Sequence, residues 1–179
     1  MKNGRWKLDD KLFIQTISNN IKPTQTILKQ FKLFQKKEMM NQEKLALLNQ
    51  WNKNTLMETL EIVFTELGDD YLVGTMPVNS RVHQPLGMLH GGANIAFAES
   101  LGSCLSNVLV IPDGKAAVGT SINSNHLKSK TDGIVTGTAK IIRKGQTLHF
   151  LEIEITDENG SLLCHCTMTN MVINRQINK

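Results

Sequence analysis

Cysteine is scarce in this sequence, and the scarcity excludes a disulfide scaffold. Three of the 179 residues are cysteines, at positions 104, 164 and 166, and an odd number cannot pair completely. With no long apolar core of a secretory signal, the pattern indicates reduced thiols in a cytoplasmic protein. Cys164 and Cys166 stand two apart in a strand-like run and share a face, with His165 on the other. Because no second pair or histidine cluster has ligand spacing, we expect packing residues and no metal site.

Long uninterrupted apolar runs are also missing. The most apolar stretch, residues 93–110, is broken by glycine, serine and asparagine, so we do not expect a membrane span. A chain of this length forms one domain of ordinary size, or one domain with an extension. No internal repeat and no linker is visible within residues 41–175, so we expect these residues to form a single domain.

Acidic residues are few at the N-terminus, where the sequence is most unusual. Residues 1–39 contain nine Lys or Arg and three Asp or Glu, whereas residues 40–179 contain eleven and thirteen. The net charge of +4 therefore originates in the first 39 residues and does not predict nucleic-acid binding by the whole chain. Pro23 separates two helix-like pieces, of which the second is basic and amphipathic, with Thr24 as its cap.

Three interpretations of residues 1–39 remain open. The segment could be a membrane-surface or partner helix, a DNA-contacting appendage, or an extension that is dispensable and not even translated. The last is suggested by Met39 and Met40, which stand just before the better-patterned sequence. We favour a dispensable basic extension over 1–39, a domain over 40–175 and a short tail over 176–179, with neither nucleic acid nor membrane as a partner.

Hydrophobic periodicity predicts a short helix over 41–54 and then an α+β fold. Strand-like alternation is found at 60–66 and 71–76 before the apolar helix, and at 116–127, 134–142, 147–156 and 161–173 after it. Pro112-Asp113-Gly114 is expected to end the helix, Asn159-Gly160 to form a hairpin turn, and residues 143–146 to form a loop. Two strands, one long helix and four strands predict an antiparallel sheet packed on that helix.

The stretch 84–92, Gln-Pro-Leu-Gly-Met-Leu-His-Gly-Gly, precedes the apolar helix. Between residues 86 and 112 only His90 and Glu99 are expected to titrate near neutral pH. An unpaired buried carboxylate is very costly, so Glu99 either has partners elsewhere or faces a polar pocket. The glycines before the helix leave amides that can bind an oxyanion, and Ser103 lies one turn from Glu99 on the same side. An N-cap followed by a satisfied core carboxylate is the alternative.

Together with four further motifs, this stretch resembles the hotdog-fold acyl-CoA thioesterases. The pattern continues in Ala98-Glu99-Ser100-Leu101-Gly102-Ser103, and the other motifs are Gly68-Asp69-Asp70, Met76-Pro77-Val78, Asn123-Ser124-Asn125-His126 and Asp157-Glu158-Asn159-Gly160. The resemblance covers roughly residues 48–173 and is greatest to the branch that includes 4-hydroxybenzoyl-CoA and 1,4-dihydroxy-2-naphthoyl-CoA hydrolases. It implies a hotdog fold, in which an antiparallel sheet wraps around one long central helix.

The resemblance also implies a catalytic site shared between two subunits of a dimer. In it Glu99 would be the general base or the nucleophile, while Gln84, His90 and the Gly91 N–H would hold the thioester carbonyl. An apolar helix preceded by free amides suits this chemistry, and a residue without a Cβ at position 91 lets a carbonyl come close.

Further residues are candidates for binding the substrate. The resemblance implies that Ser103 and His126 line the acyl pocket or orient water, and Asn125 is a further candidate beside them. The CoA phosphates could be bound by the cations Lys128, Arg143 and Lys144, together with Gly145. Alternatively, these residues are only part of the solvated surface. Lys128 stands where related sequences often have arginine, which changes the geometry of a phosphate contact. No motif surrounds His83, His149 or His165, and we expect no role for them.

We therefore expect a cytoplasmic acyl-CoA thioesterase that acts on an aromatic acyl group, as in menaquinone biosynthesis. It needs no cofactor other than the CoA of its substrate, and it is expected to be a homodimer that pairs into a homotetramer, a dimer of dimers. The alternative is a non-enzymatic acyl-CoA sensor within a transcription regulator, but residues 1–39 show no helix-turn-helix pattern and Glu99 is present. A hotdog dehydratase would use an Asp/His arrangement that we do not find.

Overall fold

The computed structural model describes residues 25–175 of a chain that divides into two compact units, residues 1–41 and 42–179. The described part of the first unit is helical, and the same helix, α2 (Gln25–Trp51), continues into the second. The helix predicted over 41–54 is confirmed as far as Trp51, but it is the end of the longer α2 and not a separate helix. No proline or glycine lies within α2 to interrupt its backbone hydrogen bonds. The helix-like piece expected before Pro23 lies outside the described residues.

A short helix and a turn precede the first strand. In this helix, α3 (Leu56–Thr59), the hydroxyl oxygen of Thr55 accepts a hydrogen bond from Met57 N–H at 3.2 Å and so caps the N-terminus. The backbone then turns through Glu61, which has a positive φ of 54°, before β1 (Val63–Leu67) begins. The strand predicted over 60–66 thus starts three residues late, because the turn that follows α3 occupies residues 60 and 61.

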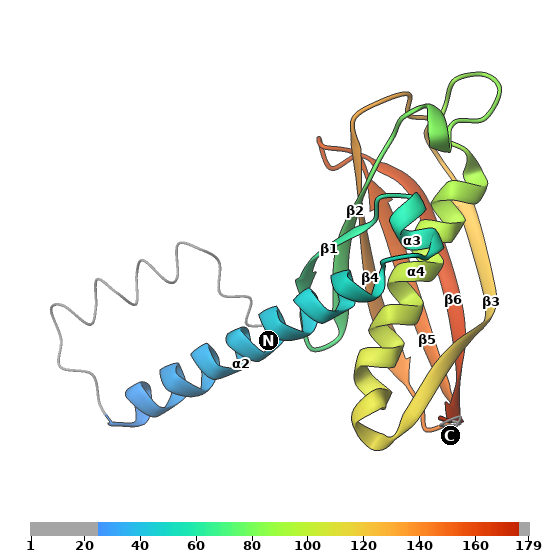
Figure 1. Ribbon diagram of the computed structural model, residues 1–179. Helices are drawn as coiled ribbons and strands as arrows, with labels where there is room; N and C mark the ends of the chain where they lie inside the picture. Colours follow the sequence, from blue (N-terminus) through green and yellow to red (C-terminus); the bar gives the residue numbers. More distant parts are fainter. Residues whose placement is uncertain (1–24, 176–179) are drawn as a thin grey trace, which may run out of the picture. The chain divides into compact units, whose positions relative to one another are not determined.

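Six antiparallel strands form one sheet in the order β1-β2-β4-β5-β6-β3. After β1 they are β2 (Tyr71–Pro77), β3 (Lys115–His126), β4 (Ile134–Lys144), β5 (Leu148–Thr156) and β6 (Leu162–Asn174). The long helix α4 (Gly91–Val110) lies along one face of the sheet (Figure 1). The predicted α+β hotdog arrangement is confirmed, with two strands, one long helix and then four strands in chain order.

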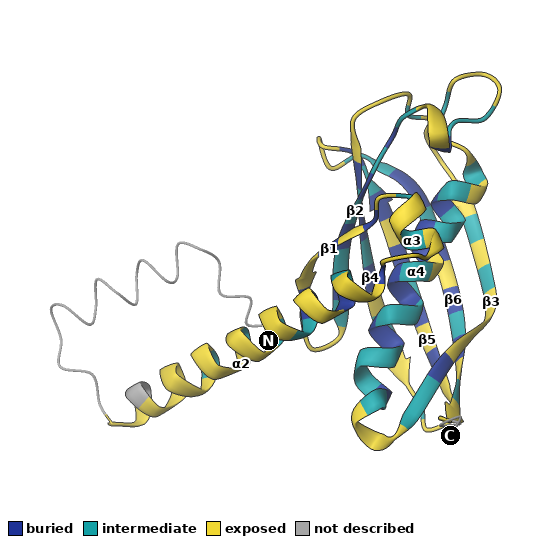
Figure 2. Cartoon of the chain, viewed as in Figure 1, coloured by how far each residue is buried: buried dark blue, intermediate teal, exposed yellow. Residues whose placement is uncertain are grey.

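The core lies between α4 and the inward face of the sheet (Figure 2). Phe97, Leu101 and Leu105 are fully buried at helical spacing, and alternate residues of β5 and of the first half of β4 are buried opposite them. Gly137 of β4 lets the helix approach, since a Cβ there would lie 2.4 Å from Leu101 Cδ1. By length and composition alone α4 could span a bilayer, but its packing is that of the central helix of this sheet.

The two edges of the sheet differ. The edge strand β1 has five residues, whereas β3 at the opposite edge has twelve. Most of β3 is exposed, including the apolar Val118, and no other strand among the described residues pairs with its outer side. A long exposed edge presents unpaired backbone groups on which a second chain can add a strand.

β4 reaches further than the sequence predicted. Arg143 and Lys144 are the last two residues of this strand and do not belong to the loop expected over 143–146. The turn after them is short, closed by the N–H of Gly145, which donates to Leu148 O at 2.9 Å. Because Arg143 and Lys144 belong to β4, the sheet fixes their backbone positions. Both lie near the C-terminal end of α4.

Candidate active site

The loop before α4 is held by backbone hydrogen bonds. His90 N–H donates to Val82 O at 2.8 Å, and Gly87 N–H donates to Gln84 O at 2.9 Å to close a turn. Within this turn the side-chain oxygen of Gln84 accepts from Leu86 N–H. That bond fixes the amide plane and leaves the side-chain nitrogen of Gln84 able to donate to a ligand.

The N-terminus of α4 offers one amide without an acceptor. His90 caps the helix: its Nδ1 accepts from Gly92 N–H at 2.8 Å, and its carbonyl accepts from the N–H groups of Ala93 and Asn94. Among the described residues the N–H of Gly91 has no such partner, so it directs partial positive charge away from the helix. Because Nδ1 of His90 is an acceptor, its neutral ring carries the proton on Nε2, a second donor at this end.

His126 occupies the space that a side chain at position 91 would need. It is the last residue of β3, and a Cβ on Gly91 would lie 2.7 Å from its Nε2. The sequence suggested that glycine makes room there for a carbonyl, but in the structure the imidazole fills that room. His126 is thus brought to the predicted site, whereas Asn125, one residue earlier in the strand, points to the opposite face.

Glu99 lies against β3 and not against Gly91 of its own chain. Its side chain is exposed, and a Cβ on Gly119 would lie 3.0 Å from its Oε1. Glu99 follows Gly91 by eight positions, which is roughly 12 Å along the axis at 1.5 Å per residue. Within one chain the two groups therefore do not face the same carbonyl. Ser103 is half-buried one turn beyond Glu99, where the helical spacing predicted it.

Two asparagines that were not selected from the sequence tie the C-terminal half of α4 to the sheet. Asn107 Nδ2 donates to Ala117 O at 2.9 Å, and its Oδ1 accepts from Ala117 N–H at 3.0 Å. The fully buried Asn170 donates to Gly102 O at 3.1 Å and to Ser106 Oγ at 2.8 Å. Asn170 stands in the inward register of β6, and a polar residue in that apolar pattern was the signal that could have identified it.

Lys128 forms an ion pair in the structure. Its Nζ lies 3.1 Å from Oδ2 of Asp157, in the hairpin turn that the sequence predicted. Asp157 also accepts from the N–H groups of Ser161 at 2.8 Å and Asn159 at 3.0 Å. These bonds, with Ser161 the largest contributor followed by Lys128, lower the pKa of Asp157 to about 2. A phosphate bound by Lys128 would have to compete with this carboxylate.

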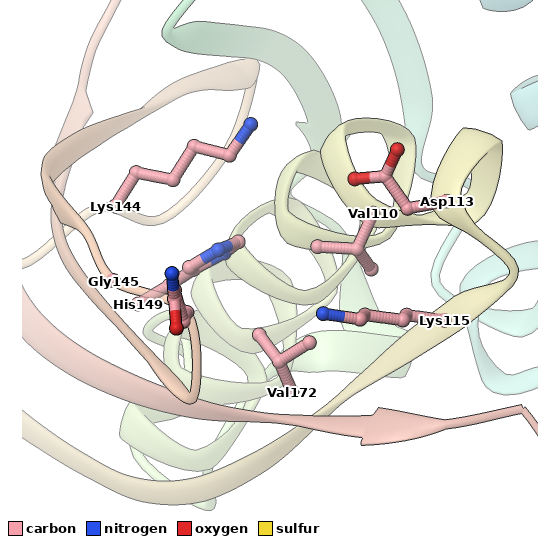
Figure 3. Close-up of a pocket in the computed structure, with 8 residues that line it drawn as sticks. Val110, Asp113, Lys115, Lys144, Gly145, His149 and Val172 are labelled. Atoms are coloured by element: carbon pink, nitrogen blue, oxygen red, sulfur yellow. The ribbon is translucent and has the colours of Figure 1, made fainter.

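The other predicted phosphate-binding residues lie at the opposite end of α4. A pocket of about 230 Å³ there is lined by Val110, Asp113, Lys115, Lys144, Gly145, Gln146, His149 and Val172 (Figure 3). With 20 residues, α4 is roughly 30 Å long at 1.5 Å per residue. Within one chain the structure therefore separates Arg143, Lys144 and Gly145 from Gly91 and His126.

His149, for which we expected no role, lines this pocket and is fully buried. Burial, and then the nearby Lys144, lower the pKa of its ring, which therefore stays neutral at neutral pH. Neither of its ring nitrogens has a hydrogen-bond partner among the described residues. The helix ends beside it as predicted, in the 3-10 turn η2 (Ile111–Asp113) followed by Gly114 at φ 70°.

The cysteines pack in the core, as the sequence predicted. Cys164 and Cys166 are fully buried on the inward face of β6, and Cys104 packs against the core from α4, where burial raises the pKa of its thiol to about 12. Cys164 also lies 3.4 Å from Nδ1 of His126. Within residues 25–175 no group of three or more His, Cys, Asp or Glu is placed to hold a metal ion.

Comparisons with known proteins agree on one family. Residues 86–164 match the model of the thioesterase superfamily. The chain is similar to the proofreading thioesterase EntH of Cronobacter sakazakii, with 41% identity over 129 residues, 72% of this chain and 93% of EntH. It is also similar to the crystal structure of a Pseudomonas aeruginosa thioesterase, with 38% identity, a TM-score of 0.71 and coverage of 73% of this chain and 94% of that one. A Staphylococcus aureus thioesterase matches with 36% identity, a TM-score of 0.64 and coverage of 65% and 97%.

Proposed function

Because this chain belongs to the thioesterase superfamily and is a thioester hydrolase, we propose that it hydrolyses an aromatic acyl-CoA to the free acid and CoA at the N-terminus of α4. The observation that supports this site is the Gly91 N–H, which has no acceptor among the described residues and stands beside His90 and His126. A thioester oxygen placed there would accept hydrogen bonds that strengthen as negative charge develops on it.

In the proposed reaction Glu99 activates the nucleophile. As a general base, its carboxylate takes a proton from water while the water oxygen bonds to the carbonyl carbon. As a direct nucleophile, it forms a mixed anhydride with the acyl group, which water then cleaves. In both routes the Gly91 N–H, His90 and Gln84 hold the carbonyl oxygen, and the C–S bond breaks to release CoA as a thiolate that takes up a proton. Ser103 would orient the water or contact the acyl group.

We further propose that each site is built from two copies of the chain. Glu99 is exposed and roughly 12 Å along α4 from Gly91 at 1.5 Å per residue, and β3 is a long exposed edge. A symmetric dimer would place Glu99 of one protomer opposite Gly91 and Gln84 of the other. The Staphylococcus aureus thioesterase was crystallised with a glutamine and, separately, a glutamate replaced by alanine, at positions 15 residues apart. Gln84 and Glu99 have the same spacing, which supports their pairing in one site.

The substrate class is tested by a hydrolysis panel. The purified full chain is given benzoyl-, 4-hydroxybenzoyl-, 1,4-dihydroxy-2-naphthoyl- and fatty acyl-CoA, and release of the free thiol is followed. We expect kcat/KM to be largest for the aromatic thioesters. A preference for fatty acyl-CoA would show that the aromatic assignment is wrong, and a lack of thiol release from every substrate would contradict the proposed reaction.

The shared site is tested by mixing subunits. Glu99→Ala and Gln84→Ala remove groups that the proposal places in the same site but on different protomers. After an equal mixture of the two is unfolded and refolded, random pairing should restore about a quarter of the sites to wild type, because each mixed dimer collects both defects in one site and neither in the other. Each variant alone must first be strongly impaired. Activity that stays at the mean of the two variants, despite proven subunit exchange, would mean that both residues serve one pocket of one chain.

A further inference from the structure

A group of four side chains stands behind His126, between β3 and β6. We call it the thiol cluster: Ser124, His126, Cys164 and Cys166. Sγ of Cys164 lies 3.0 Å from Oγ of Ser124 and 3.4 Å from Nδ1 of His126, and Sγ of Cys166 lies 3.3 Å from Oγ of Ser124. Both thiols are fully buried, whereas His126 is exposed. The cluster therefore links a closed core to the His126 ring, which lies against Gly91.

The contacts of the cluster allow its hydrogen bonds to run in one direction, from Cys166 to His126. The Cys166 thiol donates to Ser124 Oγ, so the Ser124 hydroxyl is free to donate its own proton to Sγ of Cys164. The Cys164 thiol can then donate to Nδ1 of His126 at 3.4 Å or to Sγ of Cys166 at 3.7 Å, and the shorter contact favours the imidazole. An imidazole that accepts at Nδ1 carries its proton on Nε2, the nitrogen next to Gly91.

Transfer of the thiol proton to the ring does not change this result. Hydrogen bonds from Cys166, Ser124 and His126, together with the charge of the imidazolium, lower the pKa of the Cys164 thiol to about 6. If Cys164 passes its proton to Nδ1, the ring becomes an imidazolium with protons on both nitrogens. Nε2 is a donor in the thiol–imidazole pair and in the thiolate–imidazolium pair. If the pair lost one more proton, Nδ1–H would donate to the thiolate and Nε2 would become an acceptor, so the proposal requires that this proton is retained.

We propose that Cys164 is a positioning residue, which holds His126 in the state that directs an Nε2–H to the N-terminus of α4. There the imidazole adds a side-chain donor to the Gly91 N–H for the oxygen of the thioester, and stabilises it as charge develops. Only this catalytic consequence rests on the proposed function, since the protonation of His126 is a property of the folded chain. Gly91 is needed for the same arrangement, because a side chain at position 91 would displace the His126 ring.

The protonation of His126 is read directly by NMR. In the full chain labelled with ¹⁵N, long-range imidazole correlations distinguish a proton on Nε2 from one on Nδ1, and His126→Gln assigns the signals. We expect protonated Nε2 in the wild type and a mixture of tautomers in Cys164→Ala. The matched control is Cys104→Ala, which removes the same atoms where α4 packs against the core, outside the thiol cluster, and which should keep the wild-type spectrum. A wild-type ring with its proton on Nδ1 alone would overturn the proposal, whether or not Cys164→Ala folds.

Kinetics separate positioning from packing. With the best substrate of the panel, Cys164→Ala should lower kcat about tenfold with little change in KM, as expected for the loss of roughly one oriented hydrogen bond. Cys104→Ala should stay within a factor of about two of the wild type, in the range of a merely structural change. Cys164→Ser, whose hydroxyl can donate to Nδ1, should recover much of the loss. Equal kcat values in the two alanine variants, or a serine variant no better than alanine, would reduce Cys164 to a packing residue. Failure of the whole panel would leave the NMR result standing and would remove only the catalytic consequence.

Discussion

The two ends of α4 have opposite chemistry although they belong to one uninterrupted helix. At the N-terminal end, the Gly91 N–H lacks an acceptor among the described residues and two imidazoles lie beside it. At the C-terminal end, a pocket holds the cations Lys115 and Lys144 with a buried, neutral His149. The helix dipole places partial positive charge at the first end and partial negative charge at the second. Only the first can stabilise an oxyanion, and lysines at the second are favourable whether or not they also bind a phosphate.

Glu99 lies between these ends, and its replacement should have the largest effect. We expect Glu99→Gln to keep the fold and to lose about 10²–10⁴-fold in kcat, the usual contribution of a positioned acid or base. The amide keeps the size and polarity of the side chain but can neither take a proton nor attack a carbonyl. Steady-state kinetics with circular dichroism as the control for folding will decide this. Turnover close to wild type would remove Glu99 from the mechanism.

A matched pair of glycine substitutions, one at each end of α4, tests whether the two ends differ in function. Gly91→Ala places a Cβ 2.7 Å from His126 Nε2, so the imidazole must move. We expect kcat to fall roughly tenfold to hundredfold, which does not exceed the fall caused by removing one hydrogen-bond donor from an oxyanion hole. Gly114→Ala, at the other end, meets no atom within 4 Å but must keep a φ of 70°, a strain of about 1–2 kcal/mol.

The second substitution is the control for the first. Gly114→Ala should lower Tm by a few degrees, because about 1 kcal/mol shifts the Tm of a domain this size by roughly 2–4 °C, and should leave kcat unchanged. Thermal unfolding and kinetics of both variants give the answer. If Gly114→Ala lowers kcat as much as Gly91→Ala does, the two ends are not functionally distinct.

Lys144 tests whether the C-terminal end also belongs to a substrate site. If it grips a CoA phosphate, Lys144→Ala should raise KM about threefold to tenfold at unchanged kcat, as for a lost charge-assisted contact that is equal in the ground and transition states. A thioester of pantetheine, which lacks the nucleotide, should show no change. Equal KM values for the variant and the wild type with acyl-CoA would show that Lys144 does not bind a CoA phosphate.

The smallest expected effect concerns the turn beside Lys128. Since the folded pKa of Asp157 is lowered to about 2, its ionised form stabilises the fold above the unfolded pKa of about 3.9, and this stability is lost as the pH falls toward 2. Asp157→Asn should therefore lower Tm at pH 7 and make no difference near pH 2. Melting curves from pH 7 downward would show the two Tm values converge. A constant gap in Tm would assign the effect to packing and not to charge.

The elements that the sequence predicted well are those with strong local signals. The boundaries of α4 follow from the glycines at its start and from Pro112-Asp113-Gly114 at its end. The strands after it follow from alternation and from the Asn159-Gly160 turn. The separate helix start expected at residue 41 was wrong for the opposite reason: no proline or glycine interrupts α2, which runs through that position.

The residues of the candidate site likewise fall into those that the sequence could place and those that it could not. The sequence placed Gln84, His90 and Gly91 together because they are neighbours in the chain, and it aligned Ser103 with Glu99 by helical spacing. It could not place His149 in a pocket with Lys144, nor identify the hydrogen bonds of Asn170 to α4, because these depend on which strands pair and on which face each side chain lies.

By itself the sequence determined the kinds of elements, their order and the polarity of the central helix, since hydrophobic period, caps and turn residues act over a few neighbours. Only the tertiary structure decided that His126 meets Gly91 and that Cys164 stands behind it. Those contacts join residues more than 30 positions apart, and they exist because β3 pairs with β6 in one register, with His126 opposite Cys164, while α4 packs across the same sheet. A shift of that register by one residue would turn His126 to the other face and leave the first amide of α4 without it.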